Sequence, residues 1–231
     1  GTLTNSTAGL LSNNGLLTNN NILNNLATAT LTIGAGKTLE NNDTLNNHNV
    51  FNVNGICKTN TGGVTTNHAN LTVGTTGQFI VDSGTAANNS TLTNNGYVEV
   101  KNGGMLNNPS GSTITNNDQV VLLVNGTLTN GGSFSSSDYV SLDPGSTFTN
   151  SGTATNTNSF EVNGNFTNQG GATMSNSGNL HIGSPGSITN NGIFTNLTGG
   201  ILNNTGAFTN NFNLINDDAT LLIGSGKTLN N

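Results

Sequence analysis

The chain repeats itself about every twenty residues, and this period constrains its fold more than any single residue does. The clearest register is a series of small or apolar residues with a constant spacing of 20: Phe134, Ala154, Met174, Phe194 and Leu214. A fixed period in this range is typical of a solenoid, in which each repeat buries its apolar face only by stacking on its neighbours. The sequence therefore predicts a long, regular surface.

Spacing inside the repeat predicts the cross-section of this solenoid. From Met174 onward, the apolar residues expected to face inward recur at steps of 6 or 8: Leu180, Ile188, Phe194, Leu202, Phe208, Leu214 and Leu222. Three such steps make one coil, and each face alternates apolar and polar residues like a short β-strand. Thr, Asn and Gly dominate, which disfavours helix. We predict an all-β fold, a right-handed parallel β-solenoid with three short strands per coil, about 20 residues per coil and about 11 coils.

One face is expected to carry the pattern apolar-x-apolar. Its segments are 31–33, 51–53, 71–73, 98–100, 122–124, 140–142, 160–162, 180–182 and 221–223. The steps lengthen between about 71 and 122, so a bulged coil or loop is expected around 74–120 within a single domain spanning 1–231. The residues expected to stack in the core are Phe134, Ala154, Met174, Phe194, Leu214, Phe160, Leu180, Ile188 and Phe208.

The corners of such a coil account for the unusual composition. Asn makes up roughly a fifth of the chain, and there are 32 Gly. Sharp turns pass through left-handed backbone conformations, which Gly adopts without steric cost and Asn tolerates best among the others. Asn side chains at equivalent corners can also stack, each amide bonding the next, as in cross-β ladders. We therefore expect nearly every Asn to have a structural role.

The Gly-x-Leu-x-Asn style of repeat, at about 20 residues per coil, resembles right-handed parallel β-helix segments of large bacterial surface proteins. Filamentous-haemagglutinin-type adhesins and autotransporter passengers are examples. The resemblance covers essentially the whole chain, and it implies this fold and a location outside the cell, at the cell surface. The shared motif reports the geometry of a coil and contains no active site, so no catalytic residue carries over.

Motifs for bound groups are weak. The segments 34–38 and 224–228 look like the end of a phosphate-binding loop, but Leu31 and Leu221 stand where that loop needs Gly. The three His are scattered, and a single Cys forms no metal-binding cluster. Cys57 is expected to be buried, with an exposed thiol as the alternative. The pair Asp217 and Asp218 fits a solvated corner better than a weak calcium site. We expect no metal and no cofactor.

Charge excludes further classes of function. The formal net charge is −6, with only four Lys and Arg, so the chain cannot neutralise a nucleic-acid backbone. No apolar run approaches the roughly 18 residues of a transmembrane segment. β-helical polysaccharide-cleaving enzymes need Asp, Lys or Arg clustered on one face, whereas the basic residues here are well separated. We therefore expect no enzyme activity.

Two classes of function remain. The first is a non-catalytic extracellular structural protein that builds a filament, stalk or matrix and can be adhesive. The second is a ligand-binding surface β-helix that recognises ice or a surface glycan. Outward Thr residues recur, yet they are expected to spread over more than one face: Thr129, Thr149, Thr167, Thr189, Thr195 and Thr209.

Both ends of the sequence are ordinary repeat phrases, containing Leu3 and Asn5 at one end and Leu229 and Asn231 at the other. Open end coils expose core and strand edges to a further coil. We therefore expect the chain to partner itself end to end, as a head-to-tail homopolymer or as tandem copies.

Overall fold

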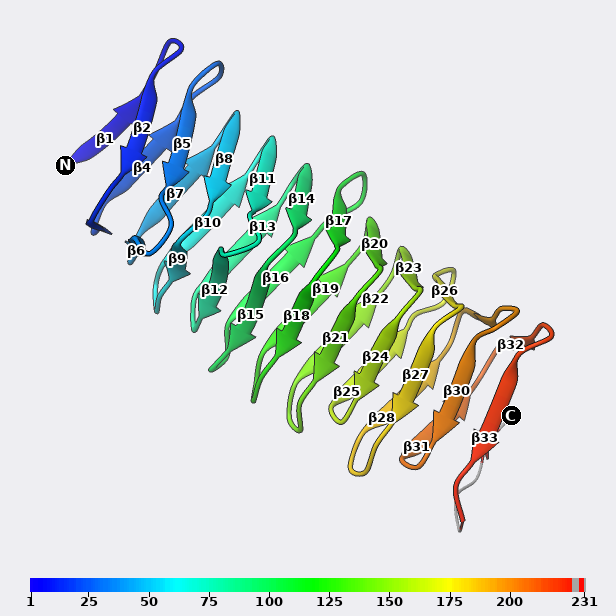
Figure 1. Ribbon diagram of the computed structural model, residues 1–231. Helices are drawn as coiled ribbons and strands as arrows, with labels where there is room; N and C mark the ends of the chain where they lie inside the picture. The colour runs from blue at the N-terminus through cyan, green and yellow to red at the C-terminus, as the bar shows by residue number, and fades with distance from the viewer. Residues whose placement is uncertain (226–228, 231) are drawn as a thin grey trace.

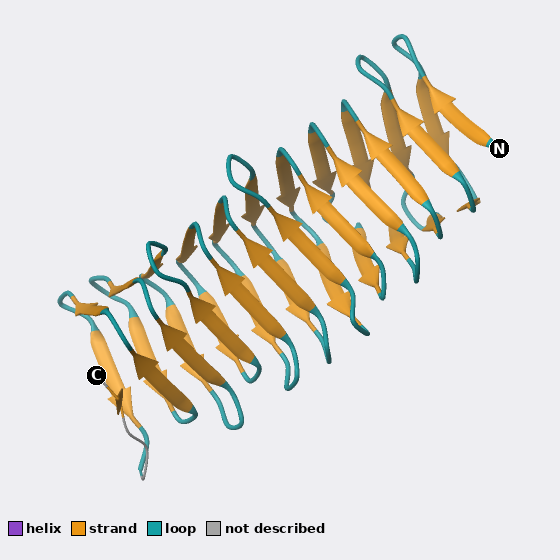
Figure 2. Cartoon of the chain, turned by 180° about the vertical axis from the view of Figure 1, so that it is seen from behind, coloured by secondary structure: helices purple, strands orange, loops and turns teal. Residues whose placement is uncertain are grey.

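The polypeptide winds into an elongated stack of coils, with the N-terminus at one end and the C-terminus at the other (Figure 1). The computed structural model describes residues 1–225 and 229–230, so Lys227 and Asn231 lie outside the described residues. Each coil contributes one strand to each of three parallel sheets, and no helix occurs in the described residues. Figure 2 shows the same stack from behind, with strands joined by short turns. The predicted all-β parallel solenoid is confirmed.

The first sheet, sheet A, has twelve strands. They are β1 (Thr2–Asn5), β4 (Ile22–Asn25), β7 (Thr44–Asn47), β10 (Val64–Asn67), β13 (Thr85–Asn88), β16 (Met105–Asn108), β19 (Thr127–Asn130), β22 (Thr147–Asn150), β25 (Asn165–Asn168), β28 (Ser187–Asn190), β31 (Ala207–Asn210) and β34 (Leu229–Asn230).

Sheets B and C have eleven strands each. Sheet B comprises β2 (Leu10–Asn13), β5 (Thr30–Ile33), β8 (Val50–Val53), β11 (Asn70–Val73), β14 (Thr91–Asn94), β17 (Thr113–Asn116), β20 (Ser133–Ser136), β23 (Thr153–Asn156), β26 (Thr173–Asn176), β29 (Ile193–Asn196) and β32 (Asn213–Asn216). Sheet C comprises β3 (Leu16–Asn19), β6 (Thr38–Asn41), β9 (Ile56–Thr59), β12 (Gln78–Asp82), β15 (Tyr97–Lys101), β18 (Gln119–Leu122), β21 (Tyr139–Leu142), β24 (Ser159–Val162), β27 (Asn179–Ile182), β30 (Ile201–Asn204) and β33 (Thr220–Ile223).

Coil length varies little along the stack. Paired first residues in sheet A are 18 residues apart at the shortest step, from Thr147 to Asn165. They are 22 apart from Ile22 to Thr44. Between 74 and 120 the coils continue without interruption, and the five-residue strands β12 and β15 lie there. With eleven strands each in sheets B and C and roughly 4.8 Å between strands, the stack is about 50 Å long.

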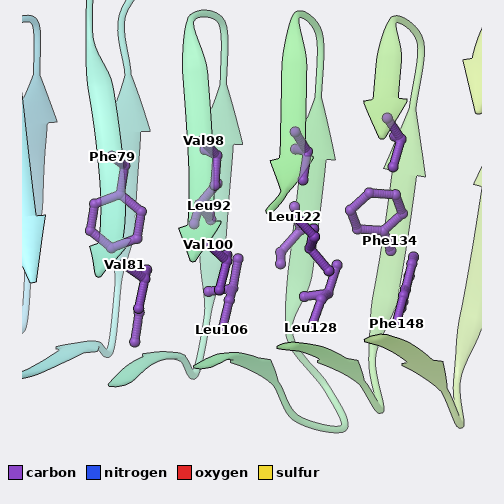
Figure 3. Packing of buried hydrophobic residues seen from close by; sticks show 14 of the residues in the cluster. Phe79, Val81, Leu92, Val98, Val100, Leu106, Leu122, Leu128, Phe134 and Phe148 are labelled. Carbon is purple, nitrogen blue, oxygen red and sulfur yellow. The ribbon is translucent and has the colours of Figure 1, made fainter. Parts of the chain in front are cut away.

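The second and fourth residues of most strands point into the coil, and the first and third point out, as in the buried and half-buried alternation of β17. This follows from the two-residue period of side chains in a strand. The second residues supply most of the apolar core, and residues of successive coils stack in files (Figure 3). Phenylalanine rings meet edge to face inside the core, with 5.1 Å between the ring centroids of Phe148 and Phe166.

The apolar-x-apolar segments do not form one face, contrary to the sequence-based prediction. Segments 31–33, 51–53 and 71–73 belong to sheet B, whereas 140–142, 160–162 and 180–182 belong to sheet C. The pattern indicates a strand whose fourth residue is apolar and buried. Such strands lie in sheet B near the N-terminal end of the stack and in sheet C farther along it. Two further expectations are wrong. Val124, expected in an apolar-x-apolar strand segment, is exposed beyond the end of β18, and Leu222, expected to face inward, is an exposed third residue of β33.

A ladder of asparagine side chains runs the length of sheet A. Every strand of sheet A from β1 to β31 has Asn as its fourth residue: Asn5, Asn25, Asn47, Asn67, Asn88, Asn108, Asn130, Asn150, Asn168, Asn190 and Asn210. Each Nδ2 donates to the Oδ1 of the next Asn toward the C-terminus, at 2.7–2.9 Å. From Asn25 to Asn190 these side chains are at most 2% exposed. The predicted stacking of Asn amides is confirmed.

The second hydrogen of each amide ties the ladder to the neighbouring sheet. Asn150 Nδ2, for example, also donates to the Thr173 carbonyl at 2.9 Å, at the start of a sheet B strand in the next coil. Asn108 Nδ2 donates to the Ser133 carbonyl in the same way, at 3.0 Å. The ladder therefore satisfies buried polar groups of the corner between sheets A and B that would otherwise be costly.

Shorter ladders occupy the other corners and are imperfect. In sheet B, Asn156 bonds Asn176 and Asn176 bonds Asn196. Ser136 interrupts this file because its hydroxyl donates to the Asp138 carbonyl, and the buried Asn156 Oδ1 has no partner among the described residues. In sheet C, Asn204 lies between Ile182 and Ile223, and neither its Oδ1 nor its Nδ2 has a partner there.

Most buried Asn residues are explained by these ladders and not by left-handed corners, which corrects part of the sequence-based interpretation. Among the described residues, seven Gly have positive φ, whereas Asn does so only at Asn102 and Asn125. The ladder Asn residues lie at the ends of strands, with their side chains directed inward. Gly at the turns, such as Gly145 with φ 86°, provides the left-handed conformation.

Replacing Asn150 by Ala should lower the free energy of unfolding by about 3 kcal/mol, because an acceptor for Asn130 and a donor to Asn168 are both lost inside the core. The matched control is Asn179→Ala, at an exposed first position of β27, where a change within about 0.5 kcal/mol is expected. Urea denaturation followed by circular dichroism measures both. Equal losses in the two variants would contradict a stabilising ladder.

Replacing Asn204 by Leu should raise the free energy of unfolding by about 2 kcal/mol, because it removes an amide that is buried without a partner and keeps a similar shape. The neighbouring outward residue Asn203 serves as the control, and Asn203→Leu should change stability by no more than about 0.5 kcal/mol. The same urea titration applies, and a destabilised Asn204→Leu variant would show that this amide is satisfied.

Candidate functional surfaces

The outer surface consists of three faces, each formed by the first and third residues of the strands of one sheet. We call them face A, face B and face C after their sheets. Their chemistry differs sharply, because the core and the ladders occupy the second and fourth positions and leave only the outward positions free to vary.

Charge is confined to face C and to the turns at its two edges. This holds for every charged side chain in the described residues: Lys37, Glu40, Asp43, Lys58, Asp82, Glu99, Lys101, Asp118, Asp138, Asp143, Glu161, Asp217 and Asp218. Thr, Ser, Asn and uncharged apolar residues fill the outward positions of faces A and B. The rod therefore has one acidic side and two uncharged sides.

Several charges on face C are paired. Lys58 Nζ lies 3.0 Å from Asp82 Oδ2, and Asn102 Nδ2 donates to Asp82 Oδ1 at 2.8 Å. Burial raises the pKa of Asp82, but these hydrogen bonds and the Lys58 charge outweigh it and hold that pKa below its ordinary value. Lys101 and Glu99 form a second ion pair.

Both tyrosines of the chain lie on face C. Tyr97 donates its hydroxyl to Glu99 Oε2 at 2.8 Å on the same strand. Tyr139 donates to Glu161 Oε2 at 2.9 Å in the next coil, and Asn163 Nδ2 donates to Glu161 Oε1 at 2.8 Å. Burial and the Glu99 carboxylate raise the pKa of Tyr97, so its phenol stays protonated. The bonds from Asn163 and Tyr139 lower the pKa of Glu161 and keep it ionised.

Face B carries a double file of hydroxyl groups. In five successive strands, β14, β17, β20, β23 and β26, the first and third residues are Thr or Ser and are paired in register. They are Thr91, Thr93, Thr113, Thr115, Ser133, Ser135, Thr153, Thr155, Thr173 and Ser175. The sequence signal for this file is the repeated phrase in which Thr or Ser flanks an apolar residue, and it becomes readable only once these segments are placed on a common sheet.

The outward Thr residues that were expected to spread over more than one face lie on two faces, A and B. Five of them share the third position of neighbouring sheet A strands: Thr129, Thr149, Thr167, Thr189 and Thr209. Thr195 lies apart from these five residues, at the third position of β29 on face B.

Two histidines that look scattered in the sequence are brought together by the coil. The rings of His48 and His68 stack in parallel, with centroids 4.6 Å apart, in equivalent turns after β7 and β10. Burial and the His48 charge lower the pKa of His68. His181 is elsewhere, at the third position of β27, and its Nε2 lies 3.0 Å from Thr205 Oγ1.

The structure also shows where the remaining sequence motifs lie. Cys57 is buried in the core, and burial raises the pKa of its thiol to about 12, so it is not a thiolate at neutral pH. Residues 34–37 form the turn between β5 and β6, and a strand follows in place of the helix of a phosphate-binding loop. Asp217 and Asp218 lie in the turn between β32 and β33.

The core residues proposed from the sequence fall into all three sheets. Phe134, Ala154, Met174, Phe194 and Leu214 are successive second residues of sheet B, and all but the half-buried Leu214 are fully buried. Phe160 and Leu180 lie opposite each other in sheet C, as do Ile188 and Phe208 in sheet A.

Of the residues proposed for end contacts, Leu3 and Asn5 lie in β1 of the first coil, and Leu229 lies in β34, the last strand of sheet A. Leu3 is 43% exposed and, with Leu17 and Leu23, lines a depression of about 260 Å³ at the open end of the first coil. Asn5 begins the sheet A ladder. Leu229 pairs with Phe208 in β34, and Asn231 is outside the described residues.

Within residues 1–225 and 229–230, no group of three or more His, Cys, Asp or Glu side chains is arranged to hold a metal ion. In the same residues there is no helix of sufficient length and apolar character to span a membrane.

No family model matches the chain, and a search of curated proteins found no significant match. Among solved structures, the chain is similar to the crystal structure of the TibC-catalyzed hyper-glycosylated TibA55-350 fragment, with 18% sequence identity and a TM-score of 0.37. The match covers 100% of this chain and 97% of that chain. A likeness of this degree does not establish a family.

Proposed function

We propose that the chain is a non-catalytic, extracellular structural protein, a rigid rod of a surface filament, stalk or matrix whose outer faces can be adhesive. The observation that carries this proposal is the sheet A ladder, which joins eleven coils through one continuous series of amide hydrogen bonds. Such a rod resists local opening, because each coil is bonded on both sides. The repeat's resemblance to bacterial surface β-helices supports the extracellular location.

We expect the rod to grow by stacking of further coils. Strands β1, β2 and β3 of the first coil each pair on one side only, and the inward Leu3 is 43% exposed. A further coil, from a second copy or from the same polypeptide, would cover this apolar end and continue all three sheets. The ladder has a direction, because every Nδ2 donates toward the C-terminal side. Addition should therefore be head to tail.

We expect the purified protein to form thin unbranched fibres with an axial repeat of about 50 Å, one stack of coils. Leu3→Lys should suppress them, because it places a charge on the apolar end. Leu10→Lys is the matched control, since Leu10 is exposed at an outward position of the same coil and is not part of the end surface. Electron microscopy and sedimentation measure the outcome. Monodisperse monomers at high concentration, or equal effects of the two substitutions, would contradict end-to-end stacking.

A second candidate function is ice binding by face B. The double hydroxyl file repeats at roughly 4.8 Å across strands and roughly 6.8 Å along each strand. It extends over five coils and contains no charged side chain. A rigid, regular array of hydroxyl groups is suited to a regular lattice of water, and the buried ladder and core beneath hold these positions fixed.

If face B binds ice, the protein should show thermal hysteresis, and Thr115→Tyr should abolish it by lifting the lattice away from the file. Thr149→Tyr makes the same change in the Thr file of face A and should leave hysteresis intact. Circular dichroism checks that both variants fold. No hysteresis in the unmodified protein, or equal loss in both variants, would exclude face B as an ice-binding surface.

A further inference from the structure

The two tyrosines of face C form the ends of a short, straight series. Tyr97, Gln119 and Tyr139 are the first residues of β15, β18 and β21, and they are paired in register. The Cα atoms of the two tyrosines are thus two strand spacings apart, on the order of 10 Å along the rod axis. Gln119 is exposed between them.

Each ring is held down on the sheet. The Tyr139 hydroxyl reaches Glu161 on the neighbouring strand, so its ring leans across the sheet and does not stand upright in solvent. The Tyr97 hydroxyl is anchored in the same way to Glu99, along its own strand. Anchored aromatic rings offer a flat apolar surface. Because these side chains are already ordered in the folded protein, they lose little conformational entropy when a ligand binds.

Polar groups without partners surround the first ring. A depression of about 140 Å³ is lined by residues that include Gln78, Tyr97, Asp118 and Gln119. Among the described residues, the side chains of Gln78, Asp118 and Gln119 form no hydrogen bond within the protein. Apolar rings beside free amide and carboxylate groups are the combination that recognises a sugar, which has apolar C–H faces and a rim of hydroxyl groups.

The charge of this surface restricts the sugar further. Glu99 is neutralised by Lys101, but Asp118, Asp138, Asp143 and Glu161 have no ion pair in the described part of the chain. An acidic polysaccharide would be repelled, and a polymer carrying ammonium groups would be attracted.

We propose that face C over β15, β18, β21 and β24 binds a linear amino-sugar polysaccharide, a polymer of glucosamine units lying along the rod axis. Its pyranose rings stack on Tyr97 and Tyr139, and the amide of Gln119 bonds its hydroxyl groups. Its ammonium groups pair with Glu161 and Asp118. This inference rests on the adhesive part of the proposed function and does not depend on fibre formation.

The test is isothermal titration of the soluble protein with a glucosamine hexamer. The hexamer should bind, and its fully N-acetylated counterpart, which has no ammonium groups, should bind about tenfold more weakly. Tyr139→Ala should weaken binding about tenfold, while Tyr139→Phe keeps the ring and should lose less. Glu161→Gln should weaken binding and flatten its salt dependence.

Thr153→Ala on face B is the control and should leave the affinity unchanged, and thermal melting verifies the fold of each variant. Because the pKa of Glu161 is lowered by its hydrogen bonds, the affinity should not fall when the pH is lowered from neutral into the mildly acidic range. The proposal is overturned if the hexamer does not bind, if the N-acetylated hexamer binds equally well, or if Tyr139→Ala has no effect. Fibre formation is measured separately, so its presence or absence does not decide this result.

Discussion

The structure depends on one interaction, the hydrogen bond between the side-chain amides of asparagines in neighbouring coils. A primary amide is costly inside an apolar core unless its donors and acceptor are engaged. Here each amide is satisfied almost entirely by the coils above and below, as Asn130 is by Asn108 and Asn150. No coil can therefore bury its own asparagine alone, and stability becomes a property of the stack.

The ladder also fixes the register of the strands. A slip of one residue would turn every Asn of a strand outward and leave its neighbours without partners. This explains why coil length varies from 18 to 22 residues while sheet A stays in register. Extra residues are taken up in the turns, where Gly145 and similar glycines supply left-handed conformations. The imperfect ladders around Ser136 and Asn204 show where the constraint is weaker.

Function is left to the outward positions, because the inward ones are committed to the core and the ladders. This division allows the three faces to differ while the coil stays the same. Hydroxyl groups lie in register on faces A and B, and the carboxylates and tyrosines lie on face C. A surface of this kind suits extended, repeating partners better than a small molecule, because neighbouring coils present equivalent groups along the rod.

The sequence by itself determined the class of fold, since the spacing of Phe134, Ala154, Met174 and Phe194 and the period-2 alternation require stacked coils of short strands. It also indicated that Asn side chains stack. It did not determine which segments share a sheet: 31–33 and 140–142 look alike but lie on different sides of the core. Only the tertiary structure decided which sheet each segment joins, because an apolar-x-apolar segment can occupy any sheet in which the fourth position is not taken by the amide ladder. The stacking of His48 on His68, the segregation of charge to face C and the hydroxyl file of face B follow from that same assignment.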